Sequence, residues 1–249
     1  MVSSGISTDA RANISYFSSD AKFNLEKPYT TSFPVDDIAG ASVSNHEWTQ
    51  VEGAIRDLRE HDLSPQLDSH GFTILPSKTT MTFDDFKSRD IVEERYFPEL
   101  ASLMQQHFPQ YKTFAFFDYA IRKRSPLYPQ AKGASTENEQ PFWRVLKGPN
   151  SDWPLAFCDS NSTDHVRDTI PNDVVYRGGL GETAFLRENG SHKWYYISHQ
   201  MVDDIFLWRN TDFPGGKLPR AFHAAFENPL SGPEDGLRES VEVRFAAFR

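Results

Sequence analysis

The stretch HKWYYISHQMVDDIFLWRN, residues 192–210, holds two short apolar runs separated by a polar segment, which indicates two neighbouring β-strands. Similar runs recur from about residue 140 to the last residues of the sequence: PFWRVLKG, WPLAFCD, DVVYRG, ETAFLREN, RAFHAAFEN and SVEVRFAAF. Short strands spaced roughly ten residues apart and separated by turn residues are typical of an antiparallel β-sandwich or barrel. The pattern therefore predicts that residues 140–249 form the main strands of a barrel.

The sequence before this region has a different texture. Residues 1–50 are rich in Ser, Asn, Asp and Pro, and we expect them to form an extended arm. Residues 51–139 should hold helices and strands that support the barrel, including a buried strand in KTFAFFDYAIRKR, residues 112–124. Helices before a β-barrel, with no linker between them, predict one α+β domain over residues 1–249.

Two local patterns place the helices. Thr82 is followed three residues later by Asp85, which resembles the capping box of a helix start. Further along, four apolar residues recur at helical spacing and should share one buried face: Tyr96, Leu100, Leu103 and Met104.

The bulk composition limits the classes of function. The 249 residues carry a formal net charge of -9 with no basic stretch, which argues against nucleic-acid binding. There is no apolar run of about 18 residues that could span a membrane, and the first residues lack a signal-peptide pattern. The single cysteine, Cys158, rules out an internal disulfide. We therefore expect a cytoplasmic protein that acts on a small molecule, binds neither nucleic acid nor membrane, and could form a homodimer.

One spacing points to a specific chemistry. His223, in RAFHAAFENP (residues 220–229), is followed fifteen residues later by Arg238 and then by Ser240. This order matches the second half of a non-haem iron site, where a histidine binds the metal and an Arg and a Ser bind the far carboxylate of 2-oxoglutarate. The first half should be a His-x-Asp or His-x-Glu upstream. None of the other histidines has an acid two residues later, where these residues stand: Trp48, Leu63, Phe72, Pro109, Arg167, Trp194 and Met201.

The order of several segments resembles a known family. These are LDSHGF, YFPEL, FDYAIRKR, WRVLKGP, DWPLAFCDS, GETAFL, FHAAFENP and RESVEVR, together with the stretch quoted first. They resemble the fungal and bacterial hydroxylase/desaturase group, which includes the small subunit of the cephamycin 7α-methoxylase system, gibberellin desaturase-like proteins and oxygenases of fungal natural-product clusters. The resemblance covers roughly residues 14–249. It implies a double-stranded β-helix (jelly-roll, cupin-like) core with N-terminal helices, and a role in secondary metabolism.

The resemblance also assigns residues. It implies that His223 is the surviving metal-ligand position and that Arg238 and Ser240 anchor the co-substrate. Trp143 and Arg144 match the family's Trp-Arg motif next to the pocket, and the family match makes Arg122 a further pocket residue.

The sequence departs from the family at one point. The family carries its His-x-Asp between the strand that ends in Arg-Lys-Arg and the Trp-Arg motif, whereas here that interval, RSPLYPQAKGASTENEQPFWRV (residues 124–145), contains no histidine. Two of three metal ligands are lost together. We therefore expect no metal ligand and no cofactor, with Fe(II) and 2-oxoglutarate as the alternative.

Each candidate residue has a structural alternative. His223 stands among Phe and Ala residues and is either a core histidine or a group that moves a proton. Strand alternation places Arg238 and Arg244 on one face, where a buried Arg needs a buried acid or a substrate anion. Trp194 and Tyr196 also share a face, which is either core packing or a pocket wall in which Tyr196 acts as an acid.

These arguments give a candidate site and three hypotheses. The candidate catalytic residues are His223, Tyr196 and Arg238, and the candidate substrate-binding residues are Trp143, Arg144, Arg122, Trp194, Ser240 and Arg244. The favoured hypothesis is a metal-independent isomerase or cyclase of fungal-type natural-product biosynthesis, in which the pocket holds two groups of one substrate in reacting geometry. The first alternative is an iron and 2-oxoglutarate hydroxylase/desaturase with a rearranged ligand set, for instance His223 with His165 or His199 and a nearby Asp. The second alternative is a catalytically inactive partner subunit of such an oxygenase.

Overall fold

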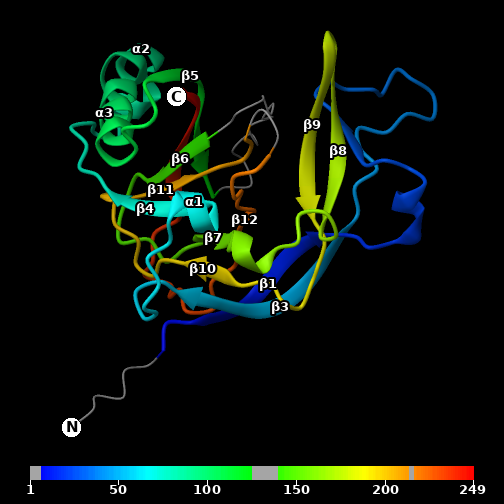
Figure 1. Cartoon of the computed structure of the whole chain (residues 1–249), viewed down its shortest axis with the longest axis horizontal. Coiled ribbons are helices and arrows are strands. Elements are labelled where there is room, and N and C mark those ends of the chain that lie inside the picture. Colours follow the sequence, from blue (N-terminus) through cyan, green and yellow to red (C-terminus); the bar gives the residue numbers. More distant parts are fainter. Residues whose placement is uncertain (1–6, 125–139, 213–215) are drawn as a thin grey trace.

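Two five-stranded sheets face each other in the computed structural model, which describes residues 7–124, 140–212 and 216–249 (Figure 1). The first sheet has the order β4 (Phe72–Pro76), β11 (Asp204–Trp208), β6 (Gln140–Val145), β13 (Glu239–Phe248) and β5 (Thr113–Lys123), and all its pairs are antiparallel. The second has the order β1 (Ala10–Phe17), β3 (Trp48–Asp57), β10 (Trp194–Tyr196), β7 (Leu155–Cys158) and β12 (His223–Ala225). Here only β3 and β10 are parallel. Together the two sheets form a jelly-roll.

The interior between the sheets is aromatic. Phe157 of β7 lies 4.5 Å from Phe206 of β11 and 5.1 Å from Phe72 of β4, measured between ring centroids. Trp143 and Trp208 belong to the same buried cluster. Because side chains alternate along a strand, every second residue of these short apolar runs reaches this interior.

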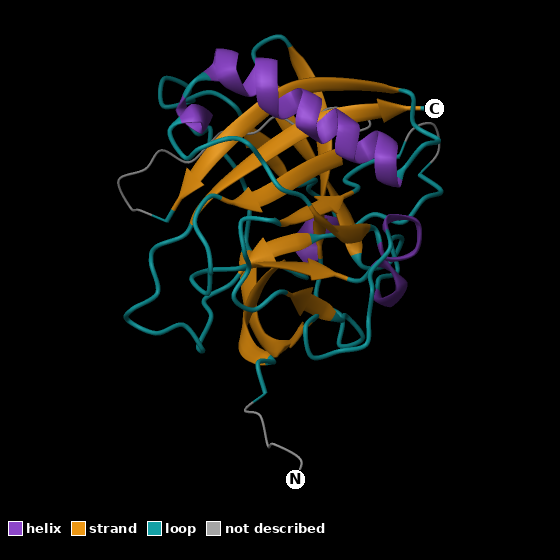
Figure 2. Cartoon of the chain, turned by 90° about the vertical axis from the view of Figure 1, so that its left-hand side faces the viewer, coloured by secondary structure: helices purple, strands orange, loops and turns teal. Residues whose placement is uncertain are grey.

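Helices cover the outer face of the first sheet (Figure 2). The main one is α3 (Phe97–His107), preceded by α2 (Arg89–Ile91) and a π-helical turn, η3 (Val92–Tyr96). The predicted helical face is confirmed, because all four of its residues are buried against the sheet: Tyr96, Leu100, Leu103 and Met104. The capping box is also present, because the Thr82 amide donates to Asp85 Oδ2 over 2.7 Å and the Asp85 amide donates to Thr82 Oγ1 over 3.4 Å. These two bonds lie at the start of the short 3-10 helix η2 (Asp85–Lys87), whose N-cap residue is Asp84.

A third sheet projects from the barrel. It pairs β2 (Tyr29–Thr31) with a long hairpin made of β8 (Thr169–Tyr176) and β9 (Gly179–Leu186), which stands upright beside the barrel in Figure 1. The remaining short elements are η1 (Ala21–Asn24), α1 (Leu67–His70) and η4 (Ser160–Ser162). None of the helices in the described part of the chain is long and apolar enough to cross a membrane.

The structure differs from the sequence interpretation in two ways. Residues 1–50, expected as an arm, include β1, which pairs with β3 over its full length. Its alternate residues Ala10, Ala12 and Ile14 are buried, so a period-two pattern was present in ARANISYF. The strand expected to be buried, β5, is only half-buried because it lies at the edge of its sheet.

Successive strands change sheet mainly in the second half of the chain, from β6 to β7 and from β10 through β11 and β12 to β13. Elsewhere consecutive strands stay in one sheet, as β1 and β3 do in the second sheet and β5 and β6 in the first. The interval that lacks the His-x-Asp motif lies between β5 and β6, and its residues 125–139 fall outside the described part of the chain. Among the described strands, β12 pairs with β7 alone and forms the edge of its sheet.

Candidate functional site

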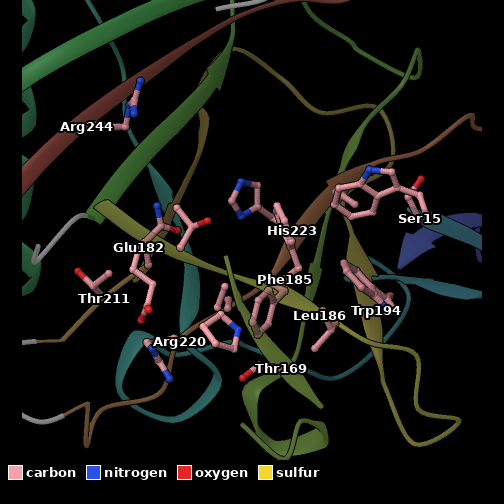
Figure 3. A pocket seen from close by; sticks show the side chains of 18 of the residues that line it. Ser15, Thr169, Glu182, Phe185, Leu186, Trp194, Thr211, Arg220, His223 and Arg244 are labelled. Carbon is pink, nitrogen blue, oxygen red and sulfur yellow. The ribbon is translucent and has the colours of Figure 1, made fainter. Parts of the chain in front are cut away.

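A cavity of about 680 Å³ opens between the barrel and the projecting hairpin. His223 and Ala224 are neighbours that point to opposite faces of β12, and both line the cavity. The cavity therefore passes around the edge of β12, from the barrel interior to the space below β8 and β9. Figure 3 shows Phe185, Leu186 and Trp194 on one side of it and Glu182, Thr211 and Arg220 on another.

His223 is exposed to this cavity although it lies deep in the molecule. Its ring centroid is 4.6 Å from that of Trp208 and 6.0 Å from that of Phe157. Desolvation by these surroundings lowers the pKa of His223; the Glu242 carboxylate opposes this shift, and Arg122 adds to it. The imidazole is therefore neutral at neutral pH and offers a lone pair, as a metal ligand or a proton acceptor must.

The inner face of β13 supplies the polar groups opposite His223. Ser240, Glu242 and Arg244 are every second residue of β13 and therefore share this face. Glu242 and Arg244 line the cavity. Glu242 accepts a hydrogen bond from Arg122 Nε over 3.0 Å, and Arg244 Nη2 donates to Asp118 over 2.6 Å. Ser240 is fully buried, and its Oγ has no hydrogen-bond partner among the described residues.

Arg238 is fixed at the start of this strand. Its backbone amide donates to Asp152 Oδ2 over 2.8 Å, and its Nη1 donates to the carbonyl of Trp153 over 2.7 Å. The guanidinium lies 5.9 Å from the ring centroid of Trp143. Desolvation and the neighbouring charge of Arg122 lower the pKa of Arg238, and its buried Nε has no partner in the described part of the chain.

The space between Arg238 and Ser240, called the co-substrate corner below, fits the carboxylate of a co-substrate. The Ser240 hydroxyl on β13 and the Nε–H of Arg238, which immediately precedes this strand, are buried without a hydrogen-bond partner among the described residues. Leaving such donors unsatisfied costs about 1–3 kcal/mol each. A carboxylate bound between Arg238 and Ser240 would satisfy both, so the residues present fit 2-oxoglutarate.

The fit to iron is incomplete. In the described ranges, no group of three or more His, Cys, Asp or Glu residues could hold a metal ion. His223 is the only histidine of these ranges that lines the cavity. His165 contacts Ser160 over 3.1 Å and His199 contacts Ser151 over 3.0 Å, and neither lines the cavity. The ligand set suggested from His165 or His199 is therefore not assembled.

The other predicted site residues are divided between the cavity and the core. Trp143 faces the barrel interior beneath Arg238, and Arg122 approaches from β5 to pair with Glu242. Trp194 lines the cavity, and its Nε1 donates to the Tyr16 hydroxyl over 2.7 Å.

Of the nine predicted site residues, His223, Trp194 and Arg244 line the cavity, and two of the other six are held well inside the fold. Tyr196 donates its hydroxyl to the backbone carbonyl of Thr8, and burial raises the pKa of Tyr196, which leaves it a poor acid. Arg144 points away from its neighbour Trp143, because adjacent residues of a strand face opposite sides. It lies under the helices, 5.6 Å from the ring centroid of Tyr96, and its Nη2 donates to Ser77 over 3.1 Å.

Sequence reasoning missed Glu242. The signal was available, since the same alternation that groups Arg238 with Arg244 also includes Glu242. Phe185 was missed as well, because it reaches the cavity only through the hairpin, whose position no local pattern specifies.

Comparison with known proteins adds the family. Residues 14–142 and 138–248 match the family model described as "YDMC: Oxidoreductase/YMDC permease-like domain". The chain is 25% identical to the "Fe(II)/2-oxoglutarate-dependent dioxygenase nvfI" of Aspergillus novofumigatus, over 84% of this chain and 87% of that protein. It is 27% identical to the "Alpha-ketoglutarate-dependent dioxygenase phiK" of a fungal species, over 76% of this chain and 81% of that protein.

Two further matches define the extent of the likeness. "Aspirochlorine biosynthesis protein N" of Aspergillus oryzae is 35% identical, but the match spans 43% of this chain and 45% of that protein. Among solved structures, a variant of the "iron and alpha-ketoglutarate-dependent endoperoxidase NvfI" superposes with a TM-score of 0.84 at 24% identity, over 100% of this chain and 99% of that one. This likeness shows the jelly-roll fold.

These relatives correct one expectation. The lost His-x-Asp led us to expect a protein without a cofactor, yet the two relatives that align with most of the chain are named as dioxygenases dependent on 2-oxoglutarate (α-ketoglutarate), one of them also on Fe(II). That expectation was wrong. The error came from treating a single missing motif as decisive when the co-substrate corner at Arg238 and Ser240 is intact.

Proposed function

Because the chain belongs to this hydroxylase/desaturase-like family of oxygenase-like proteins, we propose that it is an iron(II)- and 2-oxoglutarate-dependent oxidoreductase with a rearranged metal site. Its substrate is a small molecule of fungal-type secondary metabolism, taken up by the cavity around β12. The observation that carries the proposal is the buried Ser240 hydroxyl beside Arg238, which has no acceptor in the described part of the chain.

The co-substrate defines the overall reaction. Bound iron would supply the activation of O₂, with 2-oxoglutarate as the reductant that would leave as succinate and carbon dioxide, and the substrate would gain a hydroxyl group, or lose two hydrogens with release of water. Within this reaction, Arg238 and Ser240 bind the far carboxylate of the co-substrate through charge-assisted hydrogen bonds. His223 presents a neutral nitrogen at the cavity wall.

The cavity wall separates two kinds of contact for the substrate. Trp48 of β3, Phe185 of the hairpin strand β9 and Trp194 of β10 offer aromatic surface at the cavity wall. Such surfaces bind an apolar carbon skeleton and exclude water from the reacting atoms. Glu182 and Arg220 provide charges at the opposite wall, where they can orient polar substituents.

The proposal is tested by co-substrate turnover in the purified full-length chain. After reconstitution with Fe(II), we expect 2-oxoglutarate to bind and to be converted slowly to succinate when O₂ is admitted. Arg238→Gln should weaken 2-oxoglutarate binding about 10–100-fold, because a hydrogen-bonded ionic contact contributes roughly 1.5–3 kcal/mol.

Arg144→Gln is the matched control. Arg144 is a buried arginine that lies under the helices, on the face of β6 opposite Trp143, so its loss should leave co-substrate affinity unchanged. A wild-type chain that neither binds 2-oxoglutarate nor releases succinate contradicts the proposal. An Arg144 variant as impaired as the Arg238 variant would also count against it.

The cyclisation or isomerisation favoured by the sequence remains an untested prediction. The relatives that align with most of the chain are named as dioxygenases, so oxidation is the better supported class of reaction.

A further inference from the structure

We propose that the substrate is an acid: an apolar carbon skeleton whose anionic group, such as a carboxylate, binds the guanidinium of Arg220 at the cavity wall. This inference deepens the proposed function, on which it rests, by naming the class of the substrate. It uses none of the residues of the co-substrate corner.

The charges of the cavity wall are unevenly paired. Among the described residues, four charged side chains line the cavity: Glu182, Arg220, Glu242 and Arg244. Three of them form ion pairs of 2.6–3.0 Å within the protein: Glu182 with Lys27, Glu242 with Arg122 and Arg244 with Asp118. Arg220 is the exception, because none of the described residues forms an ion pair or a hydrogen bond with its guanidinium. The wall therefore presents one positive charge without a counterion.

The backbone on both sides of Arg220 is held in place. The buried Arg209 donates from Nη1 to the Pro219 carbonyl over 2.8 Å, and the Ala221 amide donates to the Arg209 carbonyl over 3.2 Å. Gly71 packs against the same segment, since a Cβ at this position would lie 2.6 Å from the carbonyl carbon of Arg220. A cation on a fixed backbone loses less conformational freedom when it binds an anion, which favours affinity.

The surroundings of Arg220 strengthen its attraction for an anion. Arg220 is half-buried, and the next ring towards the interior is that of Phe222, which lines the cavity and stacks on His165 at 6.0 Å. Desolvation lowers the pKa of His165, and the charge of Arg220 lowers it further, so this charge is felt inside the fold. An anion that enters the cavity meets the guanidinium in a partly desolvated place, where charges attract more strongly than in bulk water.

The other side of the cavity suits an apolar skeleton. Figure 3 shows Phe185 and Trp194 across the cavity from Arg220. Trp48 lines the same wall, and 49% of its surface is exposed, which is a large apolar area for a bound molecule to cover. The cavity thus combines aromatic surface with a single uncompensated cation, which is the complement of an apolar acid.

The position of Arg220 also bears on where the substrate reacts. Arg220 precedes His223 by three residues, so their Cα atoms are at most about 11 Å apart. An acid group bound at Arg220 therefore limits which carbon atoms of the skeleton reach His223. In this way Arg220 would act as a specificity-determining residue.

The test compares two fluorescent probes with the same aromatic frame, in the full-length chain without metal or 2-oxoglutarate. Anilinonaphthalene sulfonate is an anion, and phenylnaphthylamine is its neutral counterpart. We expect the wild type to bind one sulfonate probe per chain. Arg220→Gln should weaken binding of the sulfonate about tenfold, because a charge-assisted hydrogen bond is lost, and should leave the affinity for the neutral amine unchanged. Arg220→Lys, which keeps the charge, should recover part of the sulfonate affinity.

Two variants serve as controls. Arg177 lies in the turn between β8 and β9, over the ring of Phe33 at 4.8 Å, and does not line the cavity. Arg177→Gln removes the same charge and should leave both affinities unchanged. Trp48→Ala removes part of the aromatic wall and should weaken the binding of both probes. Circular dichroism checks that each variant is folded.

The inference is overturned if the wild type binds no sulfonate probe, or if Arg220→Gln binds it as tightly as the wild type. An equal loss in Arg177→Gln would reduce the effect to net charge and would also overturn it. Unchanged affinities in Trp48→Ala would place the probes outside this cavity, with the same consequence.

Failure of this inference is distinguishable from failure of the proposed function. If the chain releases succinate from 2-oxoglutarate but binds the sulfonate independently of Arg220, only the acidic substrate is wrong. If sulfonate binding depends on Arg220 but no succinate is released, the cavity selects acids and the proposed oxidation is wrong.

Discussion

At the scale of single residues, the chemistry of this molecule is carried by polar groups that the protein itself leaves unsatisfied. Buried polar atoms almost always have a partner, so a buried hydroxyl without one needs an explanation. Ser240 is such a case within the described residues, and Arg238 beside it is another. A ligand that enters between them is the explanation with the fewest additional assumptions.

Ser240→Ala separates a ligand-binding role from a structural one. The variant removes a hydroxyl without a described protein partner, so the free energy of unfolding of the apo chain should change by less than about 0.5 kcal/mol. The affinity for 2-oxoglutarate should fall about tenfold or more, because a hydrogen bond to a charged group is lost. Urea unfolding and calorimetric titration measure the two effects. A stability loss without an affinity loss would assign Ser240 to the core.

For Arg144 we expect the opposite of Ser240: its replacement should leave 2-oxoglutarate affinity unchanged. It is 1% exposed, and its Nε and Nη1 have no hydrogen-bond partner in the described ranges. Replacing a poorly paired buried cation by an apolar side chain of similar volume is often neutral or stabilising. We therefore expect Arg144→Met to unfold at a temperature equal to or above that of the wild type, with unchanged 2-oxoglutarate affinity. Loss of co-substrate binding in this variant would show that Arg144 does contribute to the binding pocket, as the family motif implied.

At the scale of elements, the β8–β9 hairpin is the least predictable part of the fold and the one that shapes the cavity. The runs DVVYRG and ETAFLREN correctly indicated two strands. They did not indicate that these strands would leave the barrel and pair with β2, because alternation specifies which side chains share a face but not which sheet a strand joins.

An aromatic cluster attaches this hairpin to the second sheet. Phe185 of β9 stacks on Phe17 at 5.3 Å and meets Trp48 edge-on at 4.9 Å. Phe185→Ala should destabilise the hairpin by about 3 kcal/mol and raise the hydrogen-exchange rates of β8 and β9 more than those of β6 and β13. Leu180→Ala, near the tip of the hairpin and 67% exposed, is the control and should leave exchange unchanged. Equal effects from both substitutions would contradict the anchoring role.

Asp168 fixes the start of the same hairpin. Burial alone would raise the pKa of Asp168, but hydrogen bonds from Arg167, the Asp164 amide and Asn189 hold it far below its usual range. A carboxyl whose folded pKa is depressed stabilises the fold fully above its unfolded pKa of about 3.9, and this contribution is lost as the pH falls toward the folded pKa.

The pH dependence of Asp168→Asn follows from that sign. At pH 7 the substitution should lower the free energy of unfolding by about 3 kcal/mol, because it breaks a buried network. The difference between variant and wild type should shrink as the pH is lowered from 5 to 2, because Asp168 of the unfolded chain takes up a proton in this range and the unfolded state is stabilised relative to the folded one. Chemical unfolding at several pH values measures it. A difference independent of pH would mean that hydrogen bonding geometry, not charge, is what Asp168 contributes.

At the scale of the whole molecule, the architecture was predicted correctly from the sequence, whereas the prediction of no cofactor was wrong. The strand spacing and the order of segments were enough for a jelly-roll with helices on one side, because each local run has its own periodicity. The site depends on which residues from distant strands meet. His223 and Glu242 are nineteen positions apart and belong to different sheets, so no local spacing connects them. Their shared cavity becomes visible only once both sheets are in place.

A site built from both sheets should couple its ligands to each other and to folding. A ligand that binds only the folded chain adds about 2.7 kcal/mol of stability at one hundred times its Kd. For a chain of this size that corresponds to a rise in Tm of roughly 5–10 °C. Mn(II), as a substitute for Fe(II), is expected in the cavity at His223, and 2-oxoglutarate at Ser240, which shares a face of β13 with the cavity-lining Glu242. If the two ligands touch, each should increase the affinity of the other by the same factor. Added together, they should therefore raise Tm by more than the sum of their separate shifts.

In His223→Ala this excess should vanish, while the shift from 2-oxoglutarate alone persists because Arg238 and Ser240 are intact. Strictly additive shifts in the wild type would mean that the two ligands bind at separate places, and that the barrel no longer joins them in one reaction.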